Sequence, residues 1–442
     1  MSVISLHVYG EMNLPKANKI VIKKGKHVYP DGLTINDGEI LIIKPGAHLK
    51  IGDKASILVN GGKIIAEGTR KDPIIFEATN KAWRGLQIQQ RQQRKLKLNR
   101  FWKIFRQSNK LKKREYIMKI HQENIINNCI FKKMTSENNK GYNHWEGAIE
   151  VKNSSLFIVD TELREIDNLC GILVQNSNII IKQSKFISKK LHRIINISNN
   201  SVGIIYKNVL NAFRNKPQPT DDGIWLADSV AFIYGNTIKG IADDAIDLKN
   251  TRAIIYGNNI ISVGEDGIDL DRKSKAYIIS NKIKKVSDNA IRIAGRSNSL
   301  IVDNEISQVN NGIALIYGAK VIVDNINIQN NNNGIVLVPY FARTKHIKQI
   351  SDIKMDPERR KSGIRENELY LRDSAIKNNR NDIVLLKPYS LFIKNVDFTS
   401  KAVEENIKKM SRGRSIWWKK HDNEIDGIIR SVNETRGILA EI

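Results

Sequence analysis

Several residue types and motifs that commonly mark a function are scarce in this chain. It has 442 residues but only two cysteines, Cys129 and Cys170, with nine prolines and eight histidines. Two cysteines cannot build a disulfide framework, and no Cys or His cluster has the spacing of a zinc site. We interpret both cysteines as buried thiols. No Gly-rich phosphate-binding loop is present either, so no nucleotide-binding motif is indicated.

Long apolar runs are missing as well. No stretch of 18 or more apolar residues occurs, so we expect no transmembrane helix. The first residues have neither a basic start nor the apolar stretch of a signal peptide. These features leave the compartment unknown, because the chain is either intracellular or has lost an export signal.

Acidic residues are too few to balance the basic ones. The chain has 72 Lys and Arg against 46 Asp and Glu, a net charge of +26. Such a surface attracts polyanions, including nucleic acid, anionic lipid and acidic polysaccharide. The charge is uneven, because residues 91–121 hold 12 basic residues against one acid, Glu115. Residues 343–365 add eight basic residues against three acids.

The second half of the chain contains a short apolar string that recurs at a nearly constant interval. Its form is Gly/Ala-Ile-x-Leu/Ile, and successive copies start about 22 residues apart, a period typical of solenoid repeats. The copies begin at Gly223, Ala245, Gly267, Ala290, Gly312 and Gly334. Weaker copies are predicted at Gly147, at Gly171 and, one interval later, at Arg193. The interval from Arg193 to Gly223 is longer, so we predict an inserted loop around residues 213–220.

Each repeat carries a second apolar string, and an Asn follows it. The recurring residues are Asn236, Asn258, Asn281, Asn304 and Asn325. Two short strands in each repeat, punctuated by Gly, Asn and Asp, indicate a parallel β-helix. The Asn has two open interpretations, namely a stacked amide ladder or a turn residue that tolerates a left-handed backbone.

The repeat and the N-terminal strings together resemble the pectate-lyase-like superfamily of right-handed parallel β-helices. The first coils of that fold are similar to residues 38–46, 58–61, 66–69, 73–76 and 83–86. The resemblance covers about 35–90 and 125–398. It implies an all-β, single-stranded right-handed solenoid and a secreted or cell-surface location. The activity stays open, because the superfamily includes lyases, hydrolases, epimerases and inert spikes.

Two basic insertions and a tail interrupt or extend the solenoid. Residues 91–121 lack Pro and Gly and mix apolar with basic residues, which predicts an amphipathic helix, either packed on the solenoid or binding anionic membrane or nucleic acid. The apolar tail from Ser400 is expected to be a helical cap over the open end of the solenoid, since strand edges there need cover. The predicted organisation is 1–88, N-terminal cap and first coils; 89–124, basic insertion; 125–340, main β-helix; 341–365, second basic insertion; 366–398, last coil; and 399–442, helical cap.

One face of the solenoid gathers polar residues that are able to carry chemistry. Side chains alternate along a strand, so Ile and Leu of the repeat point inward while x and the residue after Leu point outward. The candidate catalytic residues are Asp247, Asp269, Asp271, Lys249 and Arg292. The candidate substrate-binding residues are Trp225, Asp244, Asp266 and Arg272, with Trp225 as a platform for a sugar ring. The turns add Asp221, Asp222, Asp243, Glu265 and Asp288, for which a structural role is the simpler interpretation.

Carboxylates stacked this closely repel, so a raised pKa or a bridging cation is expected. Three chemistries stay open: acid–base cleavage of a glycosidic bond, binding of Ca²⁺ by Asp247, Asp269 and Asp271, and proton abstraction by Lys or Arg beside a cation. The strings Asp266-Gly-Ile-Asp269, Asp243-Asp244-Ala-Ile and Asn289-Ala-Ile-Arg292 resemble strands of polygalacturonases. The Gly-His-Gly segment of that family is absent, which argues against pectin hydrolysis.

The sequence therefore yields two functional hypotheses of different classes. The first is binding, with cleavage as a further step, of an acidic polysaccharide by the carboxylate-rich face, by a lyase or a glycoside hydrolase. The second is a non-catalytic structural or adhesive scaffold that attaches to a polyanion or an anionic membrane through its basic insertion. No cofactor is expected with certainty, and Ca²⁺ is the one considered. For the outward position of Asp269 we expect that replacement by Asn changes stability by within about 0.5 kcal/mol.

Overall fold

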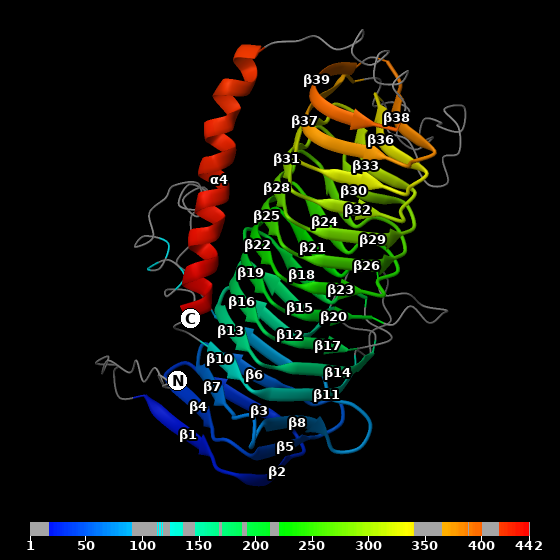
Figure 1. Ribbon diagram of the computed structural model, residues 1–442. Coiled ribbons are helices and arrows are strands. Elements are labelled where there is room, and N and C mark those ends of the chain that lie inside the picture. The colour runs from blue at the N-terminus through cyan, green and yellow to red at the C-terminus, as the bar shows by residue number, and fades with distance from the viewer. Residues whose placement is uncertain are drawn as a thin grey trace.

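The protein is a solenoid of parallel strands, wound as three stacks that share one core (Figure 1). The computed structural model describes residues 17–90, 113, 115, 117, 124–135, 146–167, 170–187, 192–212, 221–339, 365–387, 389–399 and 415–441. Within that part each coil contributes one strand to each stack, and every strand pairs in parallel with its counterpart in the next coil. This confirms the prediction of an all-β parallel β-helix.

The first stack is a sheet of 13 strands, as far as the chain is described, and it holds the recurring Gly-Ile-x-Leu string. Its strands are β3 (Leu33–Asn36), β6 (Ile57–Asn60), β9 (Leu86–Gln89), β12 (Gly147–Lys152), β15 (Cys170–Gln175), β18 (Ile195–Ser198), β21 (Ile224–Ala227), β24 (Ile246–Lys249), β27 (Ile268–Asp271), β30 (Asn289–Ile293), β33 (Asn311–Ile316), β36 (Asn333–Val338) and β38 (Asn381–Leu385).

The second stack holds the other apolar string of each repeat. Its strands are β1 (Asn18–Ile22), β4 (Glu39–Ile43), β7 (Lys63–Glu67), β10 (Asn124–Asn127), β13 (Ser155–Val159), β16 (Asn178–Lys182), β19 (Val202–Tyr206), β22 (Val230–Tyr234), β25 (Arg252–Tyr256), β28 (Lys275–Ile279), β31 (Asn298–Val302), β34 (Lys320–Asp324), β37 (Asn367–Lys377) and β39 (Tyr389–Phe398).

The third stack completes each coil with a short strand. Its strands are β2 (Gly25–Tyr29), β5 (Ala47–Ile51), β8 (Ile74–Ala78), β11 (Cys129–Thr135), β14 (Glu162–Asp167), β17 (Lys185–Ile187), β20 (Val209–Asn211), β23 (Thr237–Lys239), β26 (Asn259–Val263), β29 (Lys282–Val286), β32 (Glu305–Ser307) and β35 (Asn327–Gln329). The second and third stacks join at β37, which pairs with β34 near its start and with β35 near its end.

The register of the first stack confirms the six strong copies of the repeat. Ile224, Ile246, Ile268, Ile291, Ile313 and Ile335 lie opposite one another in successive coils. The weak copies starting at Gly147 and Arg193 were wrong by one residue, because Ile172 pairs with Ile149 and with Ile195. The weak copies depart from the regular string, so only strand pairing fixes their register.

Buried amides stack along the solenoid axis, which settles the role of the recurring Asn. Asn208, Asn236, Asn258, Asn281 and Asn304 form one ladder. In each of the first four residues, Nδ2 donates to Oδ1 of the next Asn in the ladder at 3.0 or 2.9 Å. The backbone N–H of the same residue donates to that oxygen as well. Asn325 was wrongly included, since its exposed amide donates to Asp303 outside the ladder.

The C-terminal helix exists but does not cover the end of the solenoid. Helix α4 (Ser415–Glu441) runs along the outer face of the second stack (Figure 1). Its apolar residues, including Ile428 and Val432, cluster with Phe232 and Tyr234 of that stack. Many outward side chains of the second stack are apolar, so packing α4 against them removes apolar surface from water. The expected cap position is therefore corrected to a flank position.

The basic insertions fall mostly outside the described residues. Of residues 89–124, the buried Lys113 and Ile117 are helical, and Lys113 Nζ donates to Ser431 Oγ at 2.8 Å and to Glu434 Oε2 at 3.1 Å. This end of the insertion thus packs on α4. The predicted bounds are too wide at both ends, because Gln89 lies in β9 and Asn124 begins β10. Apart from Glu115, the rest of 91–123 lies beyond what the structure describes, and so does 341–364. No helix within the described part is long and apolar enough to span a membrane.

Candidate functional site

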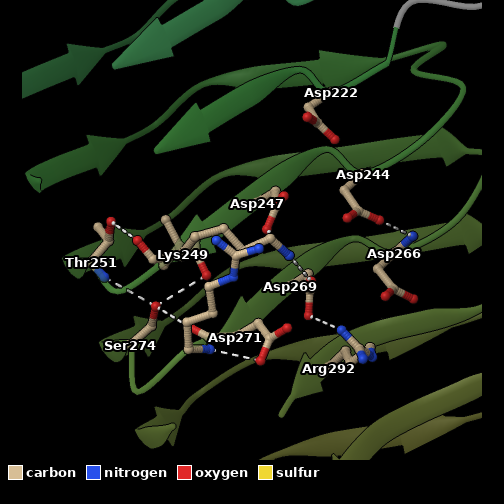
Figure 2. A network of polar contacts seen from close by, with 12 residues as sticks. Asp222, Asp244, Asp247, Lys249, Thr251, Asp266, Asp269, Asp271, Ser274 and Arg292 are labelled. Carbon is tan, nitrogen blue, oxygen red and sulfur yellow. Dashed lines mark hydrogen bonds and ion pairs between the residues drawn. The ribbon is translucent and has the colours of Figure 1, made fainter. Parts of the chain in front are cut away.

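The predicted polar face lies on the outer side of the first stack, where three columns of side chains meet (Figure 2). Trp225, Asp247, Asp269 and Arg292 occupy equivalent positions of β21, β24, β27 and β30. Lys249 and Asp271 form the next outward column. The inward Ile and Leu of the same strands are fully buried, as the alternation predicts. Register alone therefore brings the predicted catalytic residues together.

An ion-pair network ties these columns together. Lys249 Nζ lies 2.8 Å from Asp247 Oδ1 and 2.9 Å from Asp269 Oδ2. Arg292 Nη1 donates to the other oxygen of Asp269 at 2.7 Å. Asp269 is 2% exposed and Asp247 is 5% exposed. These groups are thus outward in direction yet shielded from water by their neighbours.

This burial overturns our expectation that Asp269→Asn is nearly neutral for stability. Asp269 is the shared anion of two cations, and removing a charge from a buried pair leaves its partners uncompensated. The expectation failed because the outward direction of a strand residue does not by itself expose it. Long side chains from adjacent coils cover it.

The acids of the preceding turn form a parallel column in Figure 2, running through Asp222, Asp244 and Asp266. The backbone N–H of Asp266 donates to Asp244 Oδ1 at 2.8 Å. Asp266 Oδ1 in turn accepts from the backbone and the amide of Asn289, at 2.9 and 2.7 Å. A second amide ladder continues upward from Asn289 through Asn311. These contacts support the structural interpretation of the turn acids.

Electrostatics divides the carboxyls into neutral and ionised members. Burial, reinforced by Asp269 and Asp222 and opposed by Lys249, raises the pKa of Asp247 to about 7. Burial and the nearby Asp222 and Glu265 raise the pKa of Asp243 to about 8. For Asp269, burial again acts to raise the pKa, but Arg292 and Lys249 outweigh burial, so the pKa is lowered.

The pKa values of Asp244 and Asp266 are shifted more strongly. Burial and neighbouring carboxylates hold the pKa values of Asp244 and Asp266 well above their usual range. Burial also raises the pKa of Asp222, although Arg193 opposes it. The face consequently carries far less negative charge near neutral pH than its aspartates suggest. The sequence-based expectation was a raised pKa or a bridging cation, and at Asp247 the pKa is raised while Lys249 lies between Asp247 and Asp269.

Two predicted substrate-binding residues have other neighbours. The guanidinium of Arg193 lies over the ring of Trp225, 4.2 Å from its centroid, and Arg193 Nε pairs with Asp222 Oδ2 at 2.8 Å. One face of the proposed sugar platform is therefore occupied by Arg193. Arg272 is exposed beside the buried Asp271, whose Oδ1 accepts the backbone N–H of Arg272 at 2.7 Å. Sequence reasoning missed Arg193 because the step from Ile172 to Ile195 is one residue longer than the repeat of 22, which put Arg193 in the wrong register.

The carboxylates also offer sets of oxygen ligands for a cation. Oxygens of Asp222, Asp244 and Asp247 lie within 4.8 Å of one another, and so do those of Asp244, Asp266 and Asp269. Hard cations such as Ca²⁺ prefer such oxygens. Asp243, Asp244 and Glu265 form a third set of the same kind. The predicted trio differed, since Asp271 joins none of these sets and Asp244 belongs to all three.

Comparison with known proteins supports the architecture. A family model described as "right handed beta helix region" matches residues 244–427. No curated protein matches the chain in sequence. Among solved structures, it is similar to a mannuronic acid-specific polysaccharide family 6 lyase from human gut microbiota, with 13% identity, 95% of this chain and 100% of that chain covered, and a TM-score of 0.48.

Two further solved structures are epimerases. The periplasmic alginate epimerase AlgG has 13% identity, with 85% of this chain and 78% of that chain covered, at a TM-score of 0.41. The A-module of the mannuronan C-5 epimerase AlgE4 of Azotobacter vinelandii has 11% identity, with 87% of each chain covered, at a TM-score of 0.37. At these identities the similarity concerns the fold alone.

Proposed function

We propose that this right-handed parallel β-helix protein binds an acidic polysaccharide across the first stack and cleaves its glycosidic bonds, with Asp247 as the proton donor. The observation that carries the proposal is the pairing of two buried carboxyls in adjacent coils, Asp247 beside one cation and Asp269 between two. In keeping with these contacts, burial raises the pKa of Asp247 to about 7, whereas the two cations lower that of Asp269. Cleavage of a glycosidic bond needs an acid that still holds its proton near neutrality.

The local charge favours an acidic substrate. At neutral pH the innermost groups are the partly protonated Asp247, the ionised Asp269 and two cations, Lys249 and Arg292. The sum of these four groups is positive, since one full anion and one partly protonated carboxyl face two cations, and the neighbouring Asp271 offsets part of it. An ammonium group has three donors and a guanidinium five, so each has donors beyond those used on Asp269. A substrate carboxylate at this point would complete the charge balance.

Proton abstraction by Lys249 or Arg292 is less well supported. Burial lowers the pKa of each, but Asp269 outweighs it and raises both pKa values above their ordinary range. Neither side chain readily gives up a proton, and a general base needs a pKa near the working pH. This argues for a hydrolase rather than a lyase among the two classes of enzyme that the sequence left open.

The test is product analysis on a panel of uronate-containing polymers. Hydrolysis releases reducing ends without the ultraviolet absorbance of unsaturated uronates, whereas a lyase produces both. Asp247→Asn should abolish release of reducing ends while leaving binding intact. A wild-type protein that binds these polymers but releases no ends from any of them would support the scaffold alternative instead.

A divalent cation is the second candidate, because Asp222, Asp244 and Asp247 together offer three close oxygens. Such an ion would replace the protons on these carboxyls and neutralise a substrate carboxylate. Attachment to anionic membrane or nucleic acid through residues 91–121 stays a separate prediction, since those residues lie almost wholly outside the described part.

A further inference from the structure

Beside the acid face, the turn after the first-stack strands holds an unusual tyrosine. Tyr317 follows β33 with a φ of 55°, in the left-handed region, and is 5% exposed. Equivalent positions of other coils hold Asp228, Asn250, Arg272 and Gly295, and among the described residues with positive φ Tyr317 is the only aromatic one. A bulky side chain in this conformation is strained, and such strain is often retained at binding sites.

Two arginines converge on this tyrosine. Arg365 Nε donates to the Tyr317 hydroxyl at 3.0 Å, and its guanidinium lies 5.5 Å from the ring centroid. Arg296 reaches the same hydroxyl from the coil below, where its backbone N–H donates to Tyr317 O. A β-carbon built on Gly318 would lie 3.3 Å from Arg365 Cβ and 3.6 Å from Arg296 Cγ, so the two side chains flank that glycine.

Both guanidiniums lack an anion among the described residues. No ion pair joins Arg296 or Arg365 to a described carboxylate, and both residues are exposed. Two cations that share one hydroxyl oxygen repel each other unless negative charge lies between them. The hydrogen bond from Arg365, with the further effect of Arg296, lowers the pKa of Tyr317, as expected for such a site.

The cations continue along the solenoid axis. Arg272 and Lys273 are exposed in the coil before Arg296, and the backbone N–H of Lys273 donates to Gly295 O at 3.0 Å. Successive coils are about 4.8 Å apart. Exposed cations therefore follow the edge of the first stack over successive coils, next to the column of Lys249 and Asp271.

We propose that Arg296, Arg365 and Tyr317 form a binding site for a carboxylate of an acidic sugar, next to the acid face. Arginine forks match the two oxygens of a carboxylate, and a phenol adds one hydrogen bond. The inference rests on the proposed function, because the same polymer would extend from this site to Asp247. None of these three residues is assigned a catalytic role.

The experiment measures binding apart from turnover. Calorimetric titration with uronate oligosaccharides uses the Asp247→Asn protein, so that no cleavage occurs, with and without Arg296→Gln and Arg365→Gln. We expect the double replacement to weaken binding at least tenfold and Tyr317→Phe, which keeps the ring, to weaken it a few-fold. The matched control is Arg380→Gln, since Arg380 is an exposed arginine just before β38, at the opposite end of the first-stack strands.

The outcomes separate this site from the proposed activity. Unchanged affinity in both the double variant and Tyr317→Phe would overturn the site. An equal loss in the Arg380→Gln control, or an equal loss for oligosaccharides whose carboxyls have been reduced to alcohols, would overturn carboxylate recognition. Loss of binding in the double variant, together with a wild-type protein that releases no reducing ends, would uphold the site and reject cleavage.

Discussion

Replacing Asp247 by Asn tests the electrostatics of the site through stability rather than activity. The carboxyl pKa rises from 3.8 to about 7 on folding, so between these pH values the folded state holds a proton that the unfolded state has lost. Stability contributed by this proton is complete below about pH 4 and is lost as the pH rises to about 7. Three pKa units at 1.36 kcal/mol each make this loss about 4 kcal/mol at most. Asn carries no charge in either state and escapes it.

The assay is urea denaturation of both proteins at pH 5 and pH 8, at constant ionic strength and with a chelator. We expect Asp247→Asn to gain stability relative to wild type as the pH rises. Asp228→Asn is the control, because Asp228 is an exposed carboxyl of the same face whose left-handed backbone suits Asn. The reasoning is refuted if the difference between Asp247→Asn and wild type is the same at both pH values.

Four further outcomes are expected from the described contacts. Asp269→Asn should lower the free energy of unfolding by about 3 kcal/mol at pH 7, because it leaves two partly buried cations without their shared anion; a loss below about 1 kcal/mol in urea denaturation would contradict this. Asn281→Ala should cost about 2 kcal/mol by leaving ladder partners unsatisfied, whereas exposed Asn325→Ala should cost less than half of that in the same assay. If Ca²⁺ binds, it should raise the melting temperature at pH 8, and Asp244→Asn should remove the shift, since Asp244 belongs to all three oxygen sets; an equal shift in the variant would exclude these sets. Deleting 91–121, which spares Gln89 of β9 and the buried Asn124 of β10, should leave the strand circular dichroism unchanged and reduce the salt dependence of heparin binding, since it removes the basic charge of the insertion; an unchanged salt slope would show that this charge is only solvated.

The sequence by itself determined the architecture, because the information for a solenoid is periodic. Every strong copy of Gly-Ile-x-Leu meets its counterpart at one interval, and strand alternation then sets which side chains are buried. The same arithmetic placed Asp247, Asp269 and Arg292 in one column. It failed at Arg193, where the preceding coil is one residue longer, and at Asn325, where a neighbouring turn position shifts the count by a residue.

Only the tertiary structure decided the environment of each side chain. Periodicity cannot tell that Lys249 reaches across to Asp269, that Arg193 covers Trp225, or that α4 lies along the flank. These contacts depend on side-chain reach between coils and on segments with no fixed spacing in the repeat. For the same reason the sequence predicted that carboxylates would cluster, whereas which carboxyl keeps its proton followed from burial and from the placement of two cations.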